Sequence, residues 1–161
     1  MLQLKSIDYQ IQGGMMLAEN AYIKLVPSSA KQTVTLDELK DFFHYYKEIT
    51  SKTGTQVNWN FSESAFPYEM KETDEGKGQW FYLSASDRDL YYAIILGIGT
   101  EAADTESGDS AIQSYIQVTL PEGATAGDKG KANEFCKFLA KKLKGELHLF
   151  NGRIMYFYPR K

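Results

Sequence analysis

Few residues of this chain have the types and spacing that catalysis or metal binding requires. His44, Cys136 and His148 are the chain's histidines and cysteine, and they lie far apart in the sequence. Metal ligands in a structural site usually recur at short, fixed spacings. Cys136 falls on the apolar side of a predicted helix, where a free cysteine acts as a small hydrophobic residue. The sequence predicts no catalytic residue and no metal ligand, although a Cys/His pair formed by folding, or an enzyme of unfamiliar type, stays open.

One segment formally matches a cofactor motif. Residues 97–102, GIGTEA, follow a predicted strand and fit the pattern G-x-G-x-x-A. A dinucleotide site needs a helix N-terminus there to hold the pyrophosphate, whereas acidic residues follow and would repel it. The same acids do not complete an EF-hand loop, because Tyr115 stands where the closing glutamate belongs. We expect no cofactor and a solvated loop, with a looser calcium loop as the alternative.

An aromatic segment is the first candidate for a binding surface. Residues 55–68, TQVNWNFSESAFPY, combine large aromatic side chains with short polar ones and show no sustained period. Such mixtures favour recognition of another protein. The candidate contact residues are Trp59, Phe61, Phe66 and Tyr68. The alternative is that these aromatic residues cap the core, as large apolar side chains usually do.

Basic residues in the last fifth of the chain form the second candidate. Residues 129–161 carry nine basic and two acidic residues, a net charge of +7, which leaves −10 on the remainder. This asymmetry either steers an acidic partner or reflects complementarity within the molecule, and we favour the second reading.

The candidate residues for an anionic ligand or a nucleic acid are Lys131, Lys137, Lys141, Lys142 and Lys144, with Phe138 available for stacking. The protein as a whole is acidic, with a sequence pI of about 5.4, and no recognised RNA or DNA signature appears. A nucleic acid is therefore not the partner that we expect first.

The strands that must position these residues are organised around residues 89–101, DLYYAIILGIGTE. This run is apolar at both odd and even positions, so it predicts a strand buried on both faces of a sheet. Residues 21–26 and 79–85 also read as strands. In residues 111–120 the apolar side chains alternate, which predicts that Ile112, Ile116, Val118 and Leu120 point inward and that the other face is wet.

Two amphipathic helices are predicted. Thr35 and Glu38 fit a capping box at the start of the first, which we expect to end near Gly54. Seven apolar residues of this helix fall in one half of the helical wheel: Leu36, Leu39, Phe42, Phe43, Tyr45, Tyr46 and Ile49. The second helix begins with Asp128 as its cap and runs to about Lys144, and Gly145 is expected to be the left-handed residue that ends it.

The order of elements predicts an α+β fold. Strand, helix, several mostly antiparallel strands, helix and a C-terminal β-hairpin give a two-layer sandwich, with both amphipathic helices on one face of the sheet. The pair Asn151-Gly152 favours a type I′ hairpin turn. Residues 1–15 read as an N-terminal extension, disordered or outside the domain, and residues 16–161 as one domain.

Composition predicts a cytoplasmic protein. One cysteine cannot form an intramolecular disulfide, and the N-terminal residues do not follow the pattern of a secretory signal. No apolar run approaches the roughly 20 residues that cross a bilayer, so we expect no membrane partner.

Two segments carry a resemblance to a known family. Residues 21–27, AYIKLVP, and 63–68, ESAFPY, together with the terminal helix and hairpin, resemble a family of short uncharacterised proteins of Bacillus-type bacteria. The likeness covers the chain from about Met16 to its C-terminus. No activity, site residue or partner comes with this family.

These observations favour a non-catalytic protein-binding or regulatory module. The alternative is an anionic-ligand or nucleic-acid binder that uses the lysine-rich C-terminal helix. The partner and the oligomeric state stay open.

Overall fold

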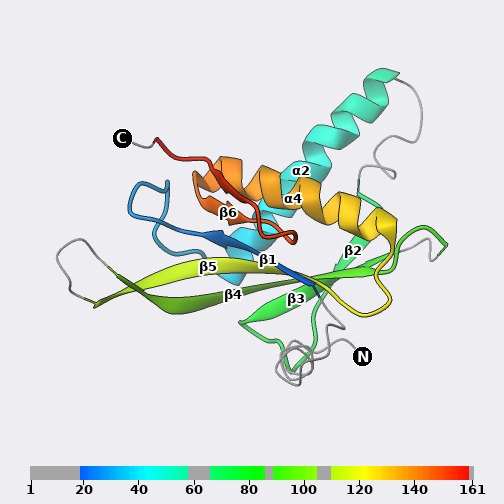
Figure 1. The fold of residues 1–161 in the computed structure, drawn as a ribbon. Helices are drawn as coiled ribbons and strands as arrows, with labels where there is room; N and C mark the ends of the chain where they lie inside the picture. The colour runs from blue at the N-terminus through cyan, green and yellow to red at the C-terminus, as the bar shows by residue number, and fades with distance from the viewer. Residues whose placement is uncertain (1–18, 58–65, 86–88, 105–109, 160–161) are drawn as a thin grey trace.

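A computed structural model describes residues 19–57, 66–85, 89–104 and 110–159 of the chain (Figure 1). The predicted extension at residues 1–15 lies outside these residues. The strands are β1 (Glu19–Lys24), β2 (Tyr68–Lys71), β3 (Trp80–Ala85), β4 (Ala93–Asp104), β5 (Ser110–Leu120), β6 (Glu146–His148) and β7 (Ile154–Tyr156), and the helices are α2 (Leu36–Val57) and α4 (Ala126–Leu143).

The strands form one seven-stranded sheet in the order β2-β3-β4-β5-β1-β6-β7. Every neighbouring pair is antiparallel. Helices α2 and α4 lie on the same face of the sheet (Figure 1). Their buried side chains and those of this sheet face form the hydrophobic core. The predicted α+β sandwich is therefore confirmed.

The first part of strand β4, residues 93–97, is buried on both faces, as its sequence predicts, whereas Thr100 and Ala102 farther along the strand are exposed. Ile94 and Leu96 belong to the core beneath the helices, while Ile95 points to the opposite face and is also fully buried. The adjacent strand β5 corrects one expectation, because its second face is not wet at Gln117 and Thr119. Both side chains are buried there and share hydrogen bonds of 2.6–3.1 Å with each other and with Asn20.

Ile112 was expected to point inward, but it is 81% exposed. It lies near the far end of the β4–β5 hairpin, which extends beyond the area that the helices cover (Figure 1). The alternation of β5 assigns Ile112 to the correct face, but no helix packs over that part of the face.

Helix α2 begins as its sequence predicts. The Glu38 amide donates to Thr35 Oγ1 at 3.1 Å, and the Thr35 amide donates to Glu38 Oε1 at 2.9 Å, which is a complete capping box. The helix continues past Gly54 to Val57, so the predicted end was wrong. A glycine in a helix interior costs about 1 kcal/mol relative to alanine, which weakens a helix without ending it.

Both ends of α4 correct the prediction by a few residues. Thr125 is the N-cap, and Asp128 occupies the third helical position, where its carboxylate accepts from the Thr125 amide at 2.8 Å. At the other end the left-handed residue is Lys144, with φ of 53°, and not Gly145. Gly145 is needed for another reason, since a Cβ there would lie 2.8 Å from Ile23 of β1.

The hairpin after α4 also differs in its turn. The Gly152 amide donates to the Leu149 carbonyl at 3.0 Å, so Phe150 and Asn151 are the central residues. Gly152 follows them with φ of 87°, and Asn151 does not have a positive φ. A type I′ turn needs a positive φ at both central residues. This hairpin therefore has a longer loop, in which a glycine follows the turn.

The carboxylate of Asp128 joins three separate segments. It accepts from the Tyr68 hydroxyl of β2 at 2.7 Å, from the Tyr92 amide at 2.9 and 3.0 Å, and from the Thr125 amide. Asp128 has no exposed surface. Burial, followed by the hydrogen bond and charge of Asp128, raises the pKa of Tyr68 well above its ordinary range.

We predict that Asp128→Ala lowers the free energy of unfolding by about 3 kcal/mol or more, because the buried Tyr68 hydroxyl and the part-buried amides of Tyr92 and Thr125 lose their acceptor. Tyr68→Phe removes one donor only and should cost about 1 kcal/mol. Urea denaturation of the two variants and of Asp128→Asn, which keeps one acceptor oxygen, measures both effects. A loss below about 1 kcal/mol for Asp128→Ala would contradict the assigned role.

The hairpin carries a pH-dependent contact. Partial burial raises the pKa of Glu146, but hydrogen bonds from Tyr158 (2.8 Å) and His148 (2.7 Å) and the charge of Lys24 together lower it below its ordinary value. A lowered folded-state pKa contributes stability that is present above the ordinary pKa and is lost as the pH falls through the folded-state pKa.

Accordingly, the Tm of the wild type should fall more steeply with acidification than that of Glu146→Gln. Thermal unfolding between neutral and acidic pH measures the difference. Glu122→Gln is the control, since Glu122 is exposed and makes no hydrogen bond or ion pair within the described part of the chain. If Glu122→Gln flattened the profile as much as Glu146→Gln, the assignment to Glu146 would be wrong.

Candidate functional site

The predicted aromatic contact surface is not supported where the structure describes it. Phe66 is buried and packs against Phe43, Tyr46 and Phe135 at centroid distances of 5.6–6.2 Å. Tyr68 is buried as well and donates its hydroxyl to Asp128. Both residues therefore cap the core, which was the alternative reading. Trp59 and Phe61 lie outside the described residues.

Phe138 packs against the neighbouring helix. Its ring stacks on Tyr45 at 6.3 Å with an interplanar angle of 21°, and it meets Tyr46 edge-on at 5.2 Å. The side chain is half-buried in this contact between α4 and α2. Phe138 therefore joins the two helices and is not an exposed anchor for a stacked base.

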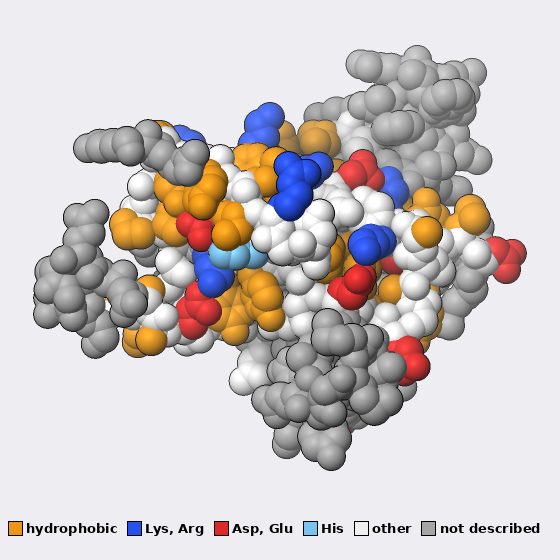
Figure 2. Space-filling view, in the orientation of Figure 1, with side chains coloured by type: hydrophobic (Ala, Val, Ile, Leu, Met, Phe, Trp, Pro, Cys, Tyr) orange, Lys and Arg blue, Asp and Glu red, His pale blue; other side chains and the backbone are white. Residues whose placement is uncertain are grey.

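The predicted lysines separate into three groups. Lys131 forms an ion pair with Glu134 at 3.1 Å and is largely covered. The ammonium of Lys142 lies 4.6 Å from the ring centre of Tyr45. Lys137, Lys141 and Lys144 are exposed and make no ion pair with any described residue. Figure 2 shows separate groups of Lys and Arg side chains, in blue, across this face of the molecule, some of them over α4.

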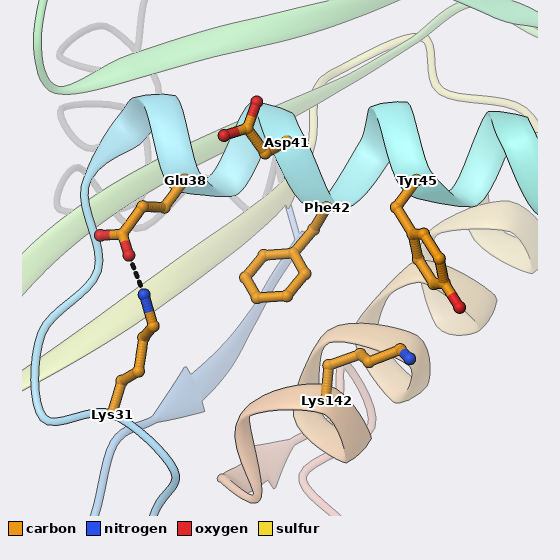
Figure 3. A pocket seen from close by; sticks show the side chains of 6 residues that line it. All are labelled: Lys31, Glu38, Asp41, Phe42, Tyr45 and Lys142. Atoms are coloured by element: carbon orange, nitrogen blue, oxygen red, sulfur yellow. Dashed lines mark hydrogen bonds and ion pairs between the residues drawn. The ribbon is translucent and has the colours of Figure 1, made fainter.

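A groove lies between the first half of α2 and the C-terminal end of α4. Its volume is about 470 Å³, and it is open to solvent. The lining residues are Lys31, Glu38, Asp41, Phe42, Tyr45 and Lys142. Figure 3 shows the ring of Phe42 between the Lys31–Glu38 ion pair on one side and Lys142 on the other. We call this site the α2/α4 groove.

The groove combines an apolar floor with charged borders. Phe42 is half-buried and Tyr45 is 43% exposed, so both rings offer apolar surface. Tyr45 stacks on the Phe138 ring, and the Lys142 ammonium lies 4.6 Å from the Tyr45 ring centre and 6.0 Å from that of Phe138. A cation over an aromatic ring is attracted to its electron-rich face. The arrangement can hold an apolar side chain next to a polar or charged one.

Sequence reasoning found Lys142 but not the other five lining residues. Phe42 and Tyr45 were placed on the apolar half of α2 and assigned to the core. The sequence signal for the groove was the width of this apolar half. Seven apolar residues cover more of the helix surface than the stripe of about 100° that a helix needs to pack on a sheet. The rings at its edge are the ones that line the groove.

The reactive side chains of the described residues lie elsewhere. Cys136 is fully buried on α4, and burial raises the pKa of its thiol to about 12. Within the described ranges, no three histidine, cysteine, aspartate or glutamate side chains are grouped to hold a metal ion. His148 contacts Glu146 in the hairpin at 2.7 Å. None of these groups lines the α2/α4 groove.

Neither helix of the described structure is both long enough and apolar enough to span a bilayer.

The fold and the groove define a small α+β domain with an aromatic site between its two helices. Residues 19–159 match the family described as "Domain of unknown function (DUF1885)". The chain belongs to this family, and the resemblance seen in residues 21–27 and 63–68 is confirmed.

A protein of unknown function from Bacillus stearothermophilus, known from a crystal structure, is 39% identical in sequence to this chain. The similarity covers 80% of this chain and 92% of that one, with a TM-score of 0.47. No curated protein matches the chain.

The burial of Cys136 leads to a simple prediction. In the folded chain its thiol should react with Ellman's reagent roughly a thousandfold more slowly than a free cysteine near neutral pH, because thiolate is the reactive form. The same chain in urea should react at the free-thiol rate. A native thiol that reacts as fast as the unfolded one would show that α4 opens readily or that Cys136 is not in the core.

Proposed function

We propose that the protein is a non-catalytic protein-binding module that holds a segment of a partner protein in the α2/α4 groove. The observation that carries the proposal is the pair of aromatic rings, half-buried Phe42 and exposed Tyr45, that line an open groove of about 470 Å³. Large aromatic side chains that stay accessible in a concave site are the residue type that dominates binding energy in protein interfaces.

The rings are already held in place before any partner arrives. Tyr45 is positioned by Phe138 and Lys142, and the Lys31–Glu38 ion pair lies beside Phe42. Fixed side chains lose little conformational entropy on binding, so more of the contact energy contributes to affinity. This favours a site that binds one kind of segment with a defined orientation.

The composition of the groove supports binding more than catalysis. Its charged groups are two lysines and two carboxylates, and the thiol of Cys136 lies in the core instead. One of the two carboxylates, Glu38, has a pKa that is lowered, whereas a general acid or base commonly has one raised toward neutrality. The hydrogen bonds of Glu38 with Lys31 and Thr35 lower this pKa.

We place this activity in the cytoplasm. The supporting observation is the single cysteine, which is free and buried. A chain with one unpaired thiol suits a reducing compartment.

A second candidate is binding of an anionic ligand or nucleic acid by the α4 lysines. The exposure of Lys137, Lys141 and Lys144 favours it. Two of the groups on which it depended are otherwise engaged, since Lys131 pairs with Glu134 and Phe138 packs on Tyr45. Protein binding therefore stays the first choice.

The proposal is tested by selecting, from a library of displayed random peptides, those that bind the full-length protein. Peptides selected by the wild type should bind Tyr45→Ala at least about tenfold more weakly, the loss typical of an interface hot spot. The matched control is Tyr156→Ala, because Tyr156 is 42% exposed, close to the 43% of Tyr45, and lies in the hairpin.

Equal losses for Tyr45→Ala and Tyr156→Ala would overturn the groove as the binding site. Selection of no peptide at all would overturn the proposed function. Circular dichroism of both variants establishes that each is folded.

A further inference from the structure

We infer that the partner segment is acidic and lies along the exposed lysines of α4, with an apolar side chain in the α2/α4 groove. This inference rests on the proposed function and adds the chemistry of the partner. We call Lys137, Lys141 and Lys144 the lysine ridge. Lys137 and Lys141 are four residues apart and lie on one side of α4, and Lys144 is the left-handed C-cap that follows the helix, so the three span about 10 Å of its C-terminal part.

The ridge lysines, like Lys47, Lys77 and Lys142, form no ion pair within the described structure, whereas six other lysines do. Lys24, Lys31, Lys40, Lys71, Lys129 and Lys131 each pair with a carboxylate. The ridge lysines are exposed and form no ion pair with any described residue. An unbalanced stripe of one sign attracts a partner of the opposite sign and speeds its approach.

The internal needs of α4 do not account for the whole ridge. Lysines spaced three and four residues apart repel one another and destabilise a helix. A cation in the last turn is favourable because of the helix dipole, and this explains Lys141. Lys137 lies almost two turns before the end of α4, where the effect of the dipole has faded. An acidic partner would relieve the repulsion.

The ridge and the groove share the C-terminal part of α4. Lys142 lines the groove and lies over Tyr45, and Lys141, the preceding residue, lies about 100° around the helix from it. The opposite border of the groove is acidic at Asp41, whose carboxylate points away from the ring of Phe42 (Figure 3). A partner should therefore place its acidic residues over α4 and an apolar residue on Phe42 and Tyr45, with no acid near the start of α2.

A nucleic acid fits these observations less well. The ridge spans only about two helical turns, and Asp41 would repel a phosphate chain that followed the groove. The Phe138 ring is packed on Tyr45 and is not free to stack on a base. An acidic protein segment needs only the short ridge and the apolar groove beside it.

The test uses the same display library on three full-length proteins. They are the wild type, the ridge reversal Lys137→Glu/Lys141→Glu, and the control reversal Lys71→Glu/Lys77→Glu, which changes the net charge equally away from α4. Peptides selected by the wild type should be enriched in aspartate and glutamate relative to the input library. The best of them should bind the ridge reversal about tenfold or more weakly and the control reversal almost unchanged, with a difference that shrinks as salt is added.

Selected peptides without acidic enrichment, or equal losses with both reversals, would overturn the inference. If such peptides still depend on Tyr45, the binding module stands and only the acidic partner fails. A fluorescent single-stranded oligonucleotide serves as the competing probe. If it bound the wild type and lost binding on ridge reversal, while no acidic peptide did so, the ridge would be a nucleic-acid site and the inference would fail.

Discussion

The buried carboxylate of Asp128 is the contact on which the arrangement of the two layers depends. A carboxylate without exposed surface is costly unless donors replace the lost water, and here Tyr68, Tyr92 and Thr125 supply them. These donors come from β2, from the segment before β4 and from the N-cap of α4. The start of α4 is therefore fixed against one end of the sheet, and the direction of the helix across the sheet follows from that attachment.

With α4 held in this way, aromatic packing sets its distance from α2. Phe135 meets Phe43 and Tyr46 edge-on, both at 5.3 Å, and also contacts Phe66 and Tyr68. Edge-to-face pairs of this kind add to the energy of burial and fix the relative orientation of the elements that carry them. The apolar half of α2 is wider than this contact, so Phe42 and Tyr45 remain at its border and form the groove.

Much of the fold could be predicted from the sequence, because its signals are local. The capping box of α2, the doubly buried first part of β4 and the faces of α4 all follow from patterns within a few residues. The candidate site could be predicted only in part, because it depends on contacts between distant segments. Asp128 meets Tyr68, which is 60 residues away, so its local capping role was visible and its role as a junction was not. The burial of Phe66 likewise depends on packing against α4, so it could not be predicted from the local sequence.

The charge asymmetry of the chain takes on a more specific meaning in the folded structure. Complementarity within the molecule, the reading that the sequence favoured, accounts for Lys129 with Glu19, while Lys131 pairs with Glu134 inside the basic segment itself. It does not extend to the lysine ridge, although α2 carries carboxylates across the groove. The carboxylate of Glu38 is engaged by Lys31, and that of Asp37 lies 4.0 Å from Lys40. These two carboxylates thus pair with other cations, whereas the ridge lysines stay exposed and form no ion pair with a described residue.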